Sequence, residues 1–462
     1  MRRNWSTIFS YASAVLVFFI AASWAILYAT GYKIDWQDWS LKKIGFILIE
    51  TYPKGASIKL AGKSIDKVTP TTIKRLLPKT YQIELTKDTY RPWTGDVVVE
   101  SGLVAEQRNI LLTLQDLPTT VLWEHPIDRL MANGDNSRLA LVVKNELWLW
   151  DVKNKKDALI LSPTLLSQQI KDRNITDITK GSLVPISFAP DNKTLLVQSR
   201  GARNYYWLSV DSDNGRITWL ASGKNITNWK WINNTELGFL QNNQLNLIIT
   251  SSKQIKTLAT NIIDYGLIDG NLYAVNKNKA GKFTLVKVDR GGFIPSEEIS
   301  ELRPASNYYL GKIKNNWLVI ATTGNLSTIL LSDKSSDGLV WQTLADKVTG
   351  KVLWDDTYLI FAQDGKLTTL EWKDVTKPKI IADHFKGDLV HFSFDTILYW
   401  DIQKLHSIDL TGQNNYDLLS LSSADEFAIV EPQMSKWLLL DTKTRYLSEV
   451  TLREKQNSLI NF

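Results

Sequence analysis

The sequence has no cysteine, which excludes disulfide bonds, thiolate chemistry and zinc sites built on cysteine. It has only four histidines, and no HExxH, GxSxG or Walker-type phosphate loop occurs in it. Lys and Arg exceed Asp and Glu only by 54 to 48, and the basic residues form no run of five or six. We therefore expect no catalytic residue, no cofactor, no metal ion and no nucleic-acid partner.

Charge is also absent between Arg3 and Lys33, and residues 7–30 are mostly apolar. This stretch is long enough to cross a bilayer, and Arg2 and Arg3 before it favour a cytoplasmic N-terminus. We expect a single-pass, uncleaved signal-anchor at residues 7–30, with residues 1–6 in the cytoplasm and a linker at 31–43. A cleaved signal peptide is the alternative, because Ser23 and Ala25 could flank a cleavage site. Aromatic residues near both ends suit the membrane interface: Trp5, Trp24, Tyr28, Tyr32, Trp36 and Trp39.

Aromatic residues are plentiful, with 18 Trp, 16 Tyr and 14 Phe in 462 residues, as is common in β-rich proteins. Residues 44–114 contain about six short runs of strand character separated by Pro and Gly. The segment "TYQIELT" at 80–86 alternates apolar and polar residues, as a half-buried strand does. We predict a small β-sandwich or barrel here.

The order of certain residues in this segment resembles the PEGA domain, a small β-domain of bacterial and archaeal envelope proteins that often follows a membrane anchor. The resemblance rests on Pro53, Gly55, Ala56, Gly62, Thr69, Pro70, Tyr81, Tyr90 and Trp93. It implies structural roles for them, with the Gly and Pro residues shaping turns and the aromatic residues filling the core. The sequence departs from the pattern at Lys54, Thr80 and Thr89, and the last two replace glycines that permit unusual backbone angles.

Beyond Leu117 an apolar strand repeatedly ends at a polar residue that is followed by a short turn. After a first step of 60 residues, these positions are 32–44 residues apart. Such a period predicts the blades of a β-propeller over residues 119–452, of seven or eight blades, with a tail at 453–462. The "TTVLWEH" segment would close the ring, and residues 162–185 are interpreted as an insertion. The repeated positions are Asp151, Asp211, Thr250, Asp289, Asp333, Asp374, Asp409 and Asp441.

The stretch "DSDNG" at residues 211–215 offers oxygen ligands for calcium, but its glycine and its last acid are misplaced for an EF-hand. We interpret it as a hairpin turn. Gly62-Lys63-Ser64 is likewise a turn, because it lacks the first glycine of a phosphate loop.

The fold class that we predict is all-β with one N-terminal transmembrane helix, a PEGA-like β-sandwich and a propeller. The expected function is non-enzymatic binding or scaffolding outside the cytoplasmic membrane, with an envelope protein or polysaccharide as partner. The alternative is an extracytoplasmic hydrolase of glycans or peptides with its site in the propeller channel. A cluster of carboxylates with a histidine at the channel mouth would favour that alternative.

Overall fold

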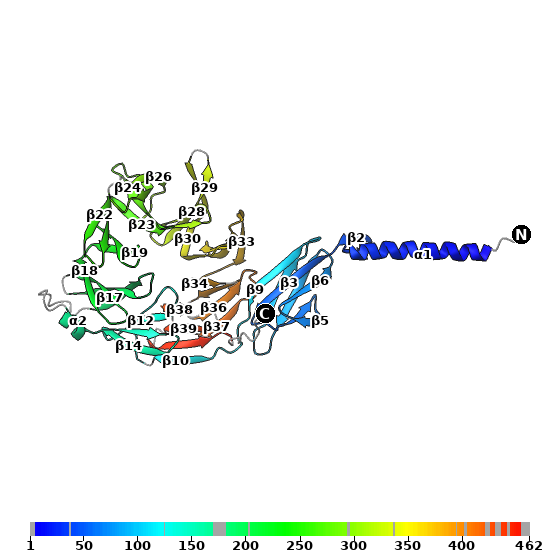
Figure 1. The fold of residues 1–462 in the computed structure, drawn as a ribbon, viewed down its shortest axis with the longest axis horizontal. Coiled ribbons are helices and arrows are strands. Elements are labelled where there is room, and N and C mark those ends of the chain that lie inside the picture. The colour runs from blue at the N-terminus through cyan, green and yellow to red at the C-terminus, as the bar shows by residue number, and fades with distance from the viewer. Residues whose placement is uncertain are drawn as a thin grey trace.

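The computed structural model describes residues 5–36, 38–123, 125–169, 182–201, 204–292, 296–335, 338–393, 395–401, 404–420, 426–429, 436–440 and 444–453. The predictions for residues 1–4, for Asp441, for residues 170–181 of the 162–185 insertion and for residues 454–462 therefore lie outside the described part. The predicted fold class is confirmed: an apolar helix, a small β-sandwich and a propeller follow one another along the chain (Figure 1).

The first element is α1 (Trp5–Ala29), whose apolar part Phe9–Ala29 has a mean hydropathy of 2.1 and contains no residue that the rest of the protein buries fully. Leaving so many apolar side chains in water is unfavourable, because little of their surface is covered by packing. Residues 31–43, expected to be a linker, contain a hairpin of β1 (Tyr32–Asp35) and β2 (Ser40–Lys43).

The sandwich packs two sheets around one apolar core. The first has the order β6 (Thr71–Leu76), β3 (Gly45–Tyr52), β9 (Val104–Leu111). The second has the order β5 (Lys63–Val68), β4 (Ser57–Leu60), β7 (Thr80–Thr86), β8 (Trp93–Val98). Alternation places every second residue of β3 and β7 in the core, for example Ile47, Ile49, Ile83 and Leu85, all with no exposed surface.

The propeller consists of four-stranded antiparallel blades in which successive strands run from the centre of the ring to its rim (Figure 1). Blade 1 holds β11 (Arg129–Ala132), β12 (Arg138–Val143), β13 (Glu146–Asp151) and β14 (Lys156–Leu161), and blade 2 holds β15 (Leu183–Phe188), β16 (Thr194–Arg200), β17 (Tyr205–Asp211) and β18 (Ile217–Gly223). Blade 3 holds β19 (Ile226–Trp231), β20 (Glu236–Gln241), β21 (Gln244–Ile249) and β22 (Ile255–Thr260). Blade 4 holds β23 (Ile262–Ile268), β24 (Asn271–Lys277), β25 (Phe283–Val288) and β26 (Glu297–Leu302). The helix α2 (Pro163–Gln169) follows β14.

Blades 5 and 6 form one seven-stranded sheet because they share a single 17-residue strand, β30 (Gly338–Trp354). Its first part pairs with β29 as the outer strand of blade 5, and its last part pairs with β31 as the inner strand of blade 6. The other strands of these blades are β27 (Asn307–Ile313), β28 (Asn316–Thr323), β29 (Leu326–Ser335), β31 (Tyr358–Gln363), β32 (Lys366–Glu371) and β33 (Asp374–Ala382).

Blade 7 holds β34 (Asp388–Ser393), β35 (Thr396–Trp400), β36 (Lys404–Asp409) and β37 (Tyr416–Ser420). Blade 8 combines β38 (Glu426–Ile429), β39 (Lys436–Leu440) and β40 (Leu447–Thr451) with the early strand β10 (Thr119–Trp123). The segment around residue 119 thus supplies a strand to the last blade, as predicted, and the described residues form eight blades.

Apolar side chains fill every junction between neighbouring blades, including that between blades 8 and 1, where Leu438 and Leu440 pack with Leu139 and Trp150. Each sheet thus buries both faces against its neighbours, which a single four-stranded sheet cannot do alone. Figure 1 looks onto one face of the ring, with the blades arranged around its centre. In this view α1 extends sideways, away from the rim of the ring.

Candidate binding surface and its mounting

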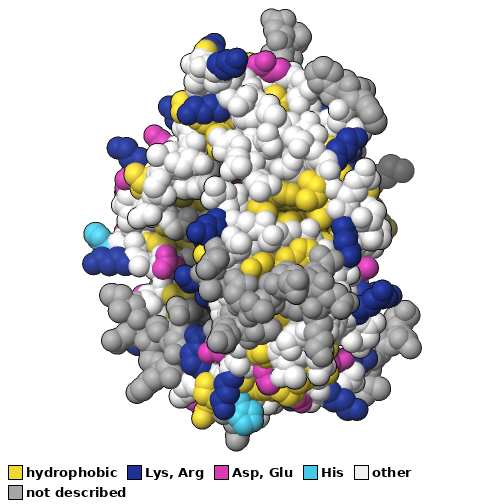
Figure 2. All heavy atoms as spheres, turned by 90° about the vertical axis from the view of Figure 1, so that its left-hand side faces the viewer, with side chains coloured by type: hydrophobic (Ala, Val, Ile, Leu, Met, Phe, Trp, Pro, Cys, Tyr) yellow, Lys and Arg dark blue, Asp and Glu magenta, His cyan; other side chains and the backbone are white. Residues whose placement is uncertain are grey.

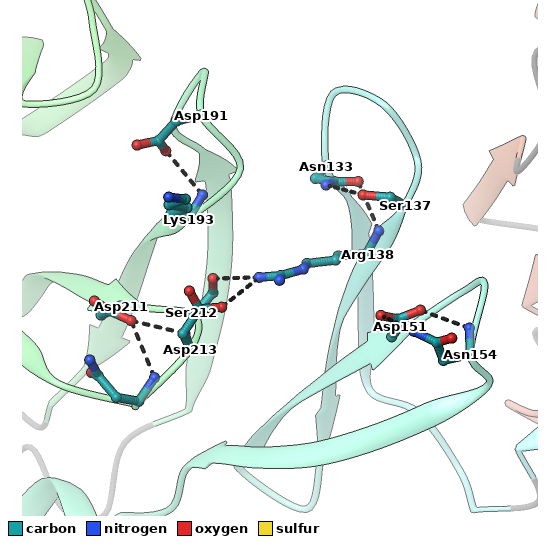
Figure 3. A network of polar contacts seen from close by, with 11 residues as sticks. Asn133, Ser137, Arg138, Asp151, Asn154, Asp191, Lys193, Asp211, Ser212 and Asp213 are labelled. Carbon is teal, nitrogen blue, oxygen red and sulfur yellow. Dashed lines mark hydrogen bonds and ion pairs between the residues drawn. The ribbon is translucent and has the colours of Figure 1, made fainter.

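Three of the repeated polar residues, Asp151, Asp211 and Asp409, close the hairpins between the third and fourth strands of their blades. Asp151 Oδ1 accepts a hydrogen bond from the backbone N–H of Asn154 at 2.8 Å, and Asp211 Oδ1 accepts from that of Asp213 at 2.9 Å (Figure 3). These contacts hold the pKa of Asp151 below its usual range. Asp and Asn favour such turns because their short side chains reach the backbone two or three residues ahead.

Two repeat positions differ from the prediction. Asp333 lies within β29 and pairs with Val340, and Asp374 begins the outer strand β33 after β32 has ended at Glu371. The "DSDNG" stretch forms the turn between β17 and β18, and its Asp213 accepts from Arg138 of the preceding blade at 2.9 Å (Figure 3). The carboxylates of this stretch therefore bond to backbone N–H groups and to an arginine.

The inner strands surround the centre of the ring, and Asp264 on β23 links three of them. Its carboxylate accepts from Asn228 Nδ2 of β19 at 2.5 Å, from Lys230 Nζ at 3.3 Å and from the backbone N–H of Tyr308 of β27 at 3.0 Å. Asp264 is only 8% exposed. Its oxygens are thus engaged in holding blades 3 to 5 together and are shielded from any ligand.

The inner strands of blades 5 to 7 carry side chains that are not fully buried, among them those of Tyr309, Lys351 and His391. Tyr309 on β27 is 50% exposed, and its ring contacts Trp354 of β30 with centroids 5.1 Å apart. Lys351 of the same strand donates to the carbonyl oxygen of Val390 on β34 at 3.0 Å. Burial and the charge of Lys351 lower the pKa of His391 to about 4, so this imidazole is neutral at physiological pH. An aromatic ring, a cation and a neutral imidazole thus border the centre of the ring.

The histidine that does meet two carboxylates lies elsewhere. His406 on β36 has its Nε2 2.9 Å from Asp401 and its Nδ1 3.0 Å from Asp417, and its ring stacks on Tyr399 at 4.8 Å. Tyr399, His406 and Asp417 lie on the second, third and fourth strands of blade 7, and Asp401 lies in the turn between the second and third strands. The group is therefore nearer to the rim of the ring than to its centre. No group of His, Asp or Glu that could hold a metal ion occurs among the residues that the structure describes.

The sandwich is fixed to the rim of the propeller through buried polar contacts. Asp409, at the end of β36, accepts from the indole Nε1–H of Trp93 at 3.0 Å and from Asn414 Nδ2 at 2.6 Å. The other oxygen of Asp409 accepts from the backbone N–H of Gly412 at 2.9 Å, which closes the turn to β37. Asn414 in turn pairs with both the N–H and the carbonyl of Thr94. One carboxylate therefore serves both the blade and the joint.

A second carboxyl group lies in the same joint. Asp395 lines a cavity of about 20 Å³ together with Trp93, Leu111 and Asp409, which is room for about one water molecule. Burial, followed by the negative charge of Asp409, raises the pKa of Asp395 to about 7. The joint is completed by the backbone, where the N–H of Leu114 donates to the carbonyl of Leu452 in blade 8 at 2.8 Å.

The motif residues of the sandwich take the following places. Tyr81, Tyr90, Trp93 and Ala56 lie in its core, and Thr69 binds the turn before it by accepting from the N–H groups of Gly55, through its carbonyl, and Ala56, through its hydroxyl. Pro53 and Pro70 both follow cis peptide bonds, and Gly62 is the second residue of the two-residue turn between β4 and β5. Thr89 has a φ of 67°, so it adopts the left-handed conformation for which a glycine is better suited.

The family model of the PEGA domain matches residues 44–115. Residues 44–115 form a PEGA domain. The resemblance carried by the motif residues is thereby confirmed, and it covers the whole sandwich together with the first residues that lead to the propeller. The search of curated proteins found no match.

Three solved structures similar to the chain illustrate the propeller. The Dos1 propeller shares 10% identity, covers 72% of this chain and 94% of its own, and has a TM-score of 0.48. An oligogalacturonate lyase in complex with manganese shares 10%, with 73% and 98% covered and a TM-score of 0.41. The propeller domain of the Trilobed protease from Pyrococcus furiosus shares 11%, with 65% and 97% covered and a TM-score of 0.38.

The PEGA domain also carries a polar hollow of about 820 Å³ that is lined in part by Gly55, Glu84, Lys87 and Thr89. Sequence reasoning did not identify this hollow, nor the joint at Asp409, nor the exposed Tyr309. Asp409 and Trp93 had both been singled out in the sequence, Asp409 as a repeated position at the end of a strand and Trp93 as a core residue of the PEGA motif. Neither role pointed to a contact between the two residues. Figure 2 shows the side of the propeller far from α1, where Lys and Arg side chains are scattered.

Proposed function

We propose that this protein is a non-enzymatic binding platform of the cell envelope, anchored in the cytoplasmic membrane by α1. Residues before α1 lie in the cytoplasm, and the PEGA domain and propeller lie outside, where PEGA domains are generally found. Its partner is an envelope protein or polysaccharide. The observation that carries the proposal is the joint at Asp409, because it fixes the propeller to the PEGA domain at one side of the ring (Figure 1).

Contacts of α1 support an anchor that is retained. The guanidinium of Arg75 in the PEGA domain lies 3.6 Å from the centre of the Tyr28 ring, and its Nη1 donates to the Tyr28 carbonyl at 3.4 Å. Cleavage near Ser23 would leave this contact on a short remnant of the helix, with no role for the apolar residues before it. Protease treatment of intact cells tests the placement, and protection of residues 40–462 would contradict it.

The inner strands of blades 5 to 7 are the proposed contact surface. A half-exposed Tyr309 resting on Trp354 offers an aromatic face of fixed orientation, which suits a sugar ring or an apolar side chain. The cation of Lys351 lies on the next inner strand. Asp264, by contrast, is saturated by donors from its own neighbours, so it is not proposed as a ligand contact.

The test places a photo-crosslinking residue at position 309 of the full chain in living cells. Ile255 on the outer strand β22 is a matched control, because it is also 50% exposed. We expect a specific crosslinked product at position 309 that is absent at 255. Tyr309→Ala should then weaken binding of the partner found in that product about tenfold, which corresponds to about 1.4 kcal/mol of binding free energy. Equal crosslinking at both positions would contradict this surface, and release of cleaved product by the purified protein would favour the hydrolase.

A further inference from the structure

The hairpin of β1 and β2 exposes two indole rings beside the end of α1. Trp36 is 64% exposed and Trp39 80% exposed, and their rings meet edge to face with centroids 5.4 Å apart. Such large apolar rings are costly to leave in water, and Trp prefers the boundary between bilayer and water. Nothing within the described part of the chain covers this pair.

The hairpin holds these rings outward. Lys42 on β2 bonds to the carboxylates of Asp35 and Asp38, at 2.9 Å to the former, and these two residues stand on either side of Trp36. The ion pairs of Lys42 thus hold the two ends of the turn together, while the indole rings of Trp36 and Trp39 remain exposed. The hairpin is therefore a formed element that presents its aromatic residues.

A groove of about 170 Å³ separates the hairpin from the last turns of α1. Its wall is mainly apolar, and two cations, Lys33 and Arg75, border it. The apolar lining residues are Trp24, Leu27, Tyr28, Tyr32, Ile34, Trp36 and Leu41. The groove adjoins the apolar surface of α1, in which no residue of the Phe9–Ala29 span is fully buried by the protein. An apolar groove edged by positive charge matches a phospholipid, whose chains are apolar and whose phosphate is negative.

We propose that the hairpin is a second membrane contact, in which Trp36, Trp39 and the groove lie among phospholipids of the leaflet from which α1 emerges. This inference rests on the proposed membrane anchoring of α1. One helix alone leaves the outer domains free to tilt and turn about its end. A second contact, joined to the PEGA domain by the N–H of Ile44 donating to the Gly31 carbonyl at 2.8 Å, fixes the angle of the PEGA domain to the membrane.

The absence of cysteine makes a clean test possible, because a single introduced cysteine carries a single spin label. The full chain is placed in nanodiscs of phosphatidylcholine and phosphatidylglycerol in equal parts. Labels at Trp39→Cys and Leu41→Cys report the hairpin and the groove, and Phe18→Cys reports the middle of α1. Lys54→Cys is the control, because it lies past the far end of β3, roughly 26 Å from the hairpin. Accessibility to oxygen and to a water-soluble nickel complex gives the depth of each label.

We expect the Phe18 label in the hydrocarbon core, the Trp39 and Leu41 labels at headgroup depth, and the Lys54 label in water. Hairpin labels as accessible to the nickel complex as the Lys54 label, with the Phe18 label in the core, would overturn this inference and leave the anchoring intact. A water-exposed Phe18 label would overturn the anchoring and this inference together. Unchanged circular dichroism of each variant shows that the exposed substitutions leave the fold in place.

Discussion

The two ends of the PEGA domain are joined to their neighbours in different ways. At the propeller end the indole of Trp93, the carboxylate of Asp409 and the amide of Asn414 are buried and bonded to one another. At the helix end the contact is a cation over a ring, Arg75 on Tyr28, beside aromatic residues that remain exposed. One joint is complete within the chain, and the other leaves exposed aromatic rings that the proposed membrane contact would cover.

This difference predicts that the joint between the PEGA domain and the propeller is rigid and that the contact between α1 and the PEGA domain is weak. A buried hydrogen-bonded carboxylate is costly to disrupt, because its partners lose their bonds without regaining water. An exposed cation–π contact contributes only about 0.5–1 kcal/mol. The PEGA domain and propeller should therefore move as one body, and the direct contact between α1 and the PEGA domain should be the weaker of the two joints.

The largest effect on this comparison is expected from Asp409→Ala. The substitution removes the acceptor of Trp93 and Asn414 and leaves their buried N–H groups unpaired, at a cost of roughly 3 kcal/mol. The joint should open, which hydrogen exchange would detect as faster exchange in β8. Asp151→Ala is the matched control, since Asp151 closes the equivalent turn in blade 1 without touching the PEGA domain. Equal exchange in β8 of the two variants would refute the role of Asp409.

A pH-dependent effect is expected at Asp395, whose pKa rises from 3.8 to about 7 on folding. The folded protein holds this proton more tightly than the unfolded chain, so its stability falls as pH rises from about 4 to about 7. Asp395→Asn stays neutral and avoids this loss. Its Tm should exceed that of the unmodified protein by about 2–4 °C at pH 8 and converge with it near pH 4. A Tm difference that does not change with pH would refute the titration of Asp395 in this range.

A smaller effect is expected from Trp93→Phe, which keeps an aromatic ring in the core but removes the N–H donated to Asp409. Because Asp409 retains Asn414 as a donor, the loss should be about 1 kcal/mol, measured by urea unfolding. Trp219→Phe offers a comparison in a partly buried position of blade 2. Exchange in β8 should quicken for Trp93→Phe alone.

The smallest effect on stability is expected from Arg75→Gln, about 0.5–1 kcal/mol, because the contact with Tyr28 is exposed. The distance between spin labels on α1 and on the PEGA domain in nanodiscs should nevertheless broaden. The distance between labels on the PEGA domain and on the propeller should stay narrow. Broadening of both distances would contradict two joints of different stiffness.

Much of the fold could be predicted from the sequence because its causes are local. Alternation revealed β7, the motif from Pro53 to Trp93 revealed the sandwich, and acids that close hairpins, such as Asp151 and Asp211, revealed the blades. The blade count stayed open, in part because β30 passes from blade 5 to blade 6 without a break. The joint could not be predicted, since Trp93 and Asp409 are 316 residues apart and only tertiary packing brings them together.

The strand β10 has a mechanical consequence. It follows the PEGA domain and completes blade 8 by pairing with β40, so a pulling force between the proposed anchor and a proposed partner would enter the propeller at the strand pair that closes it. Pulling β10 alone would peel its hydrogen bonds away one after another. The bonds of Leu114 to Leu452 and of Thr451 to Pro118, with the Asp409 joint on blade 7, carry part of that force past the clasp. In the proposed membrane-anchored protein, these contacts would protect the pairing of β10 with β40 from such a force.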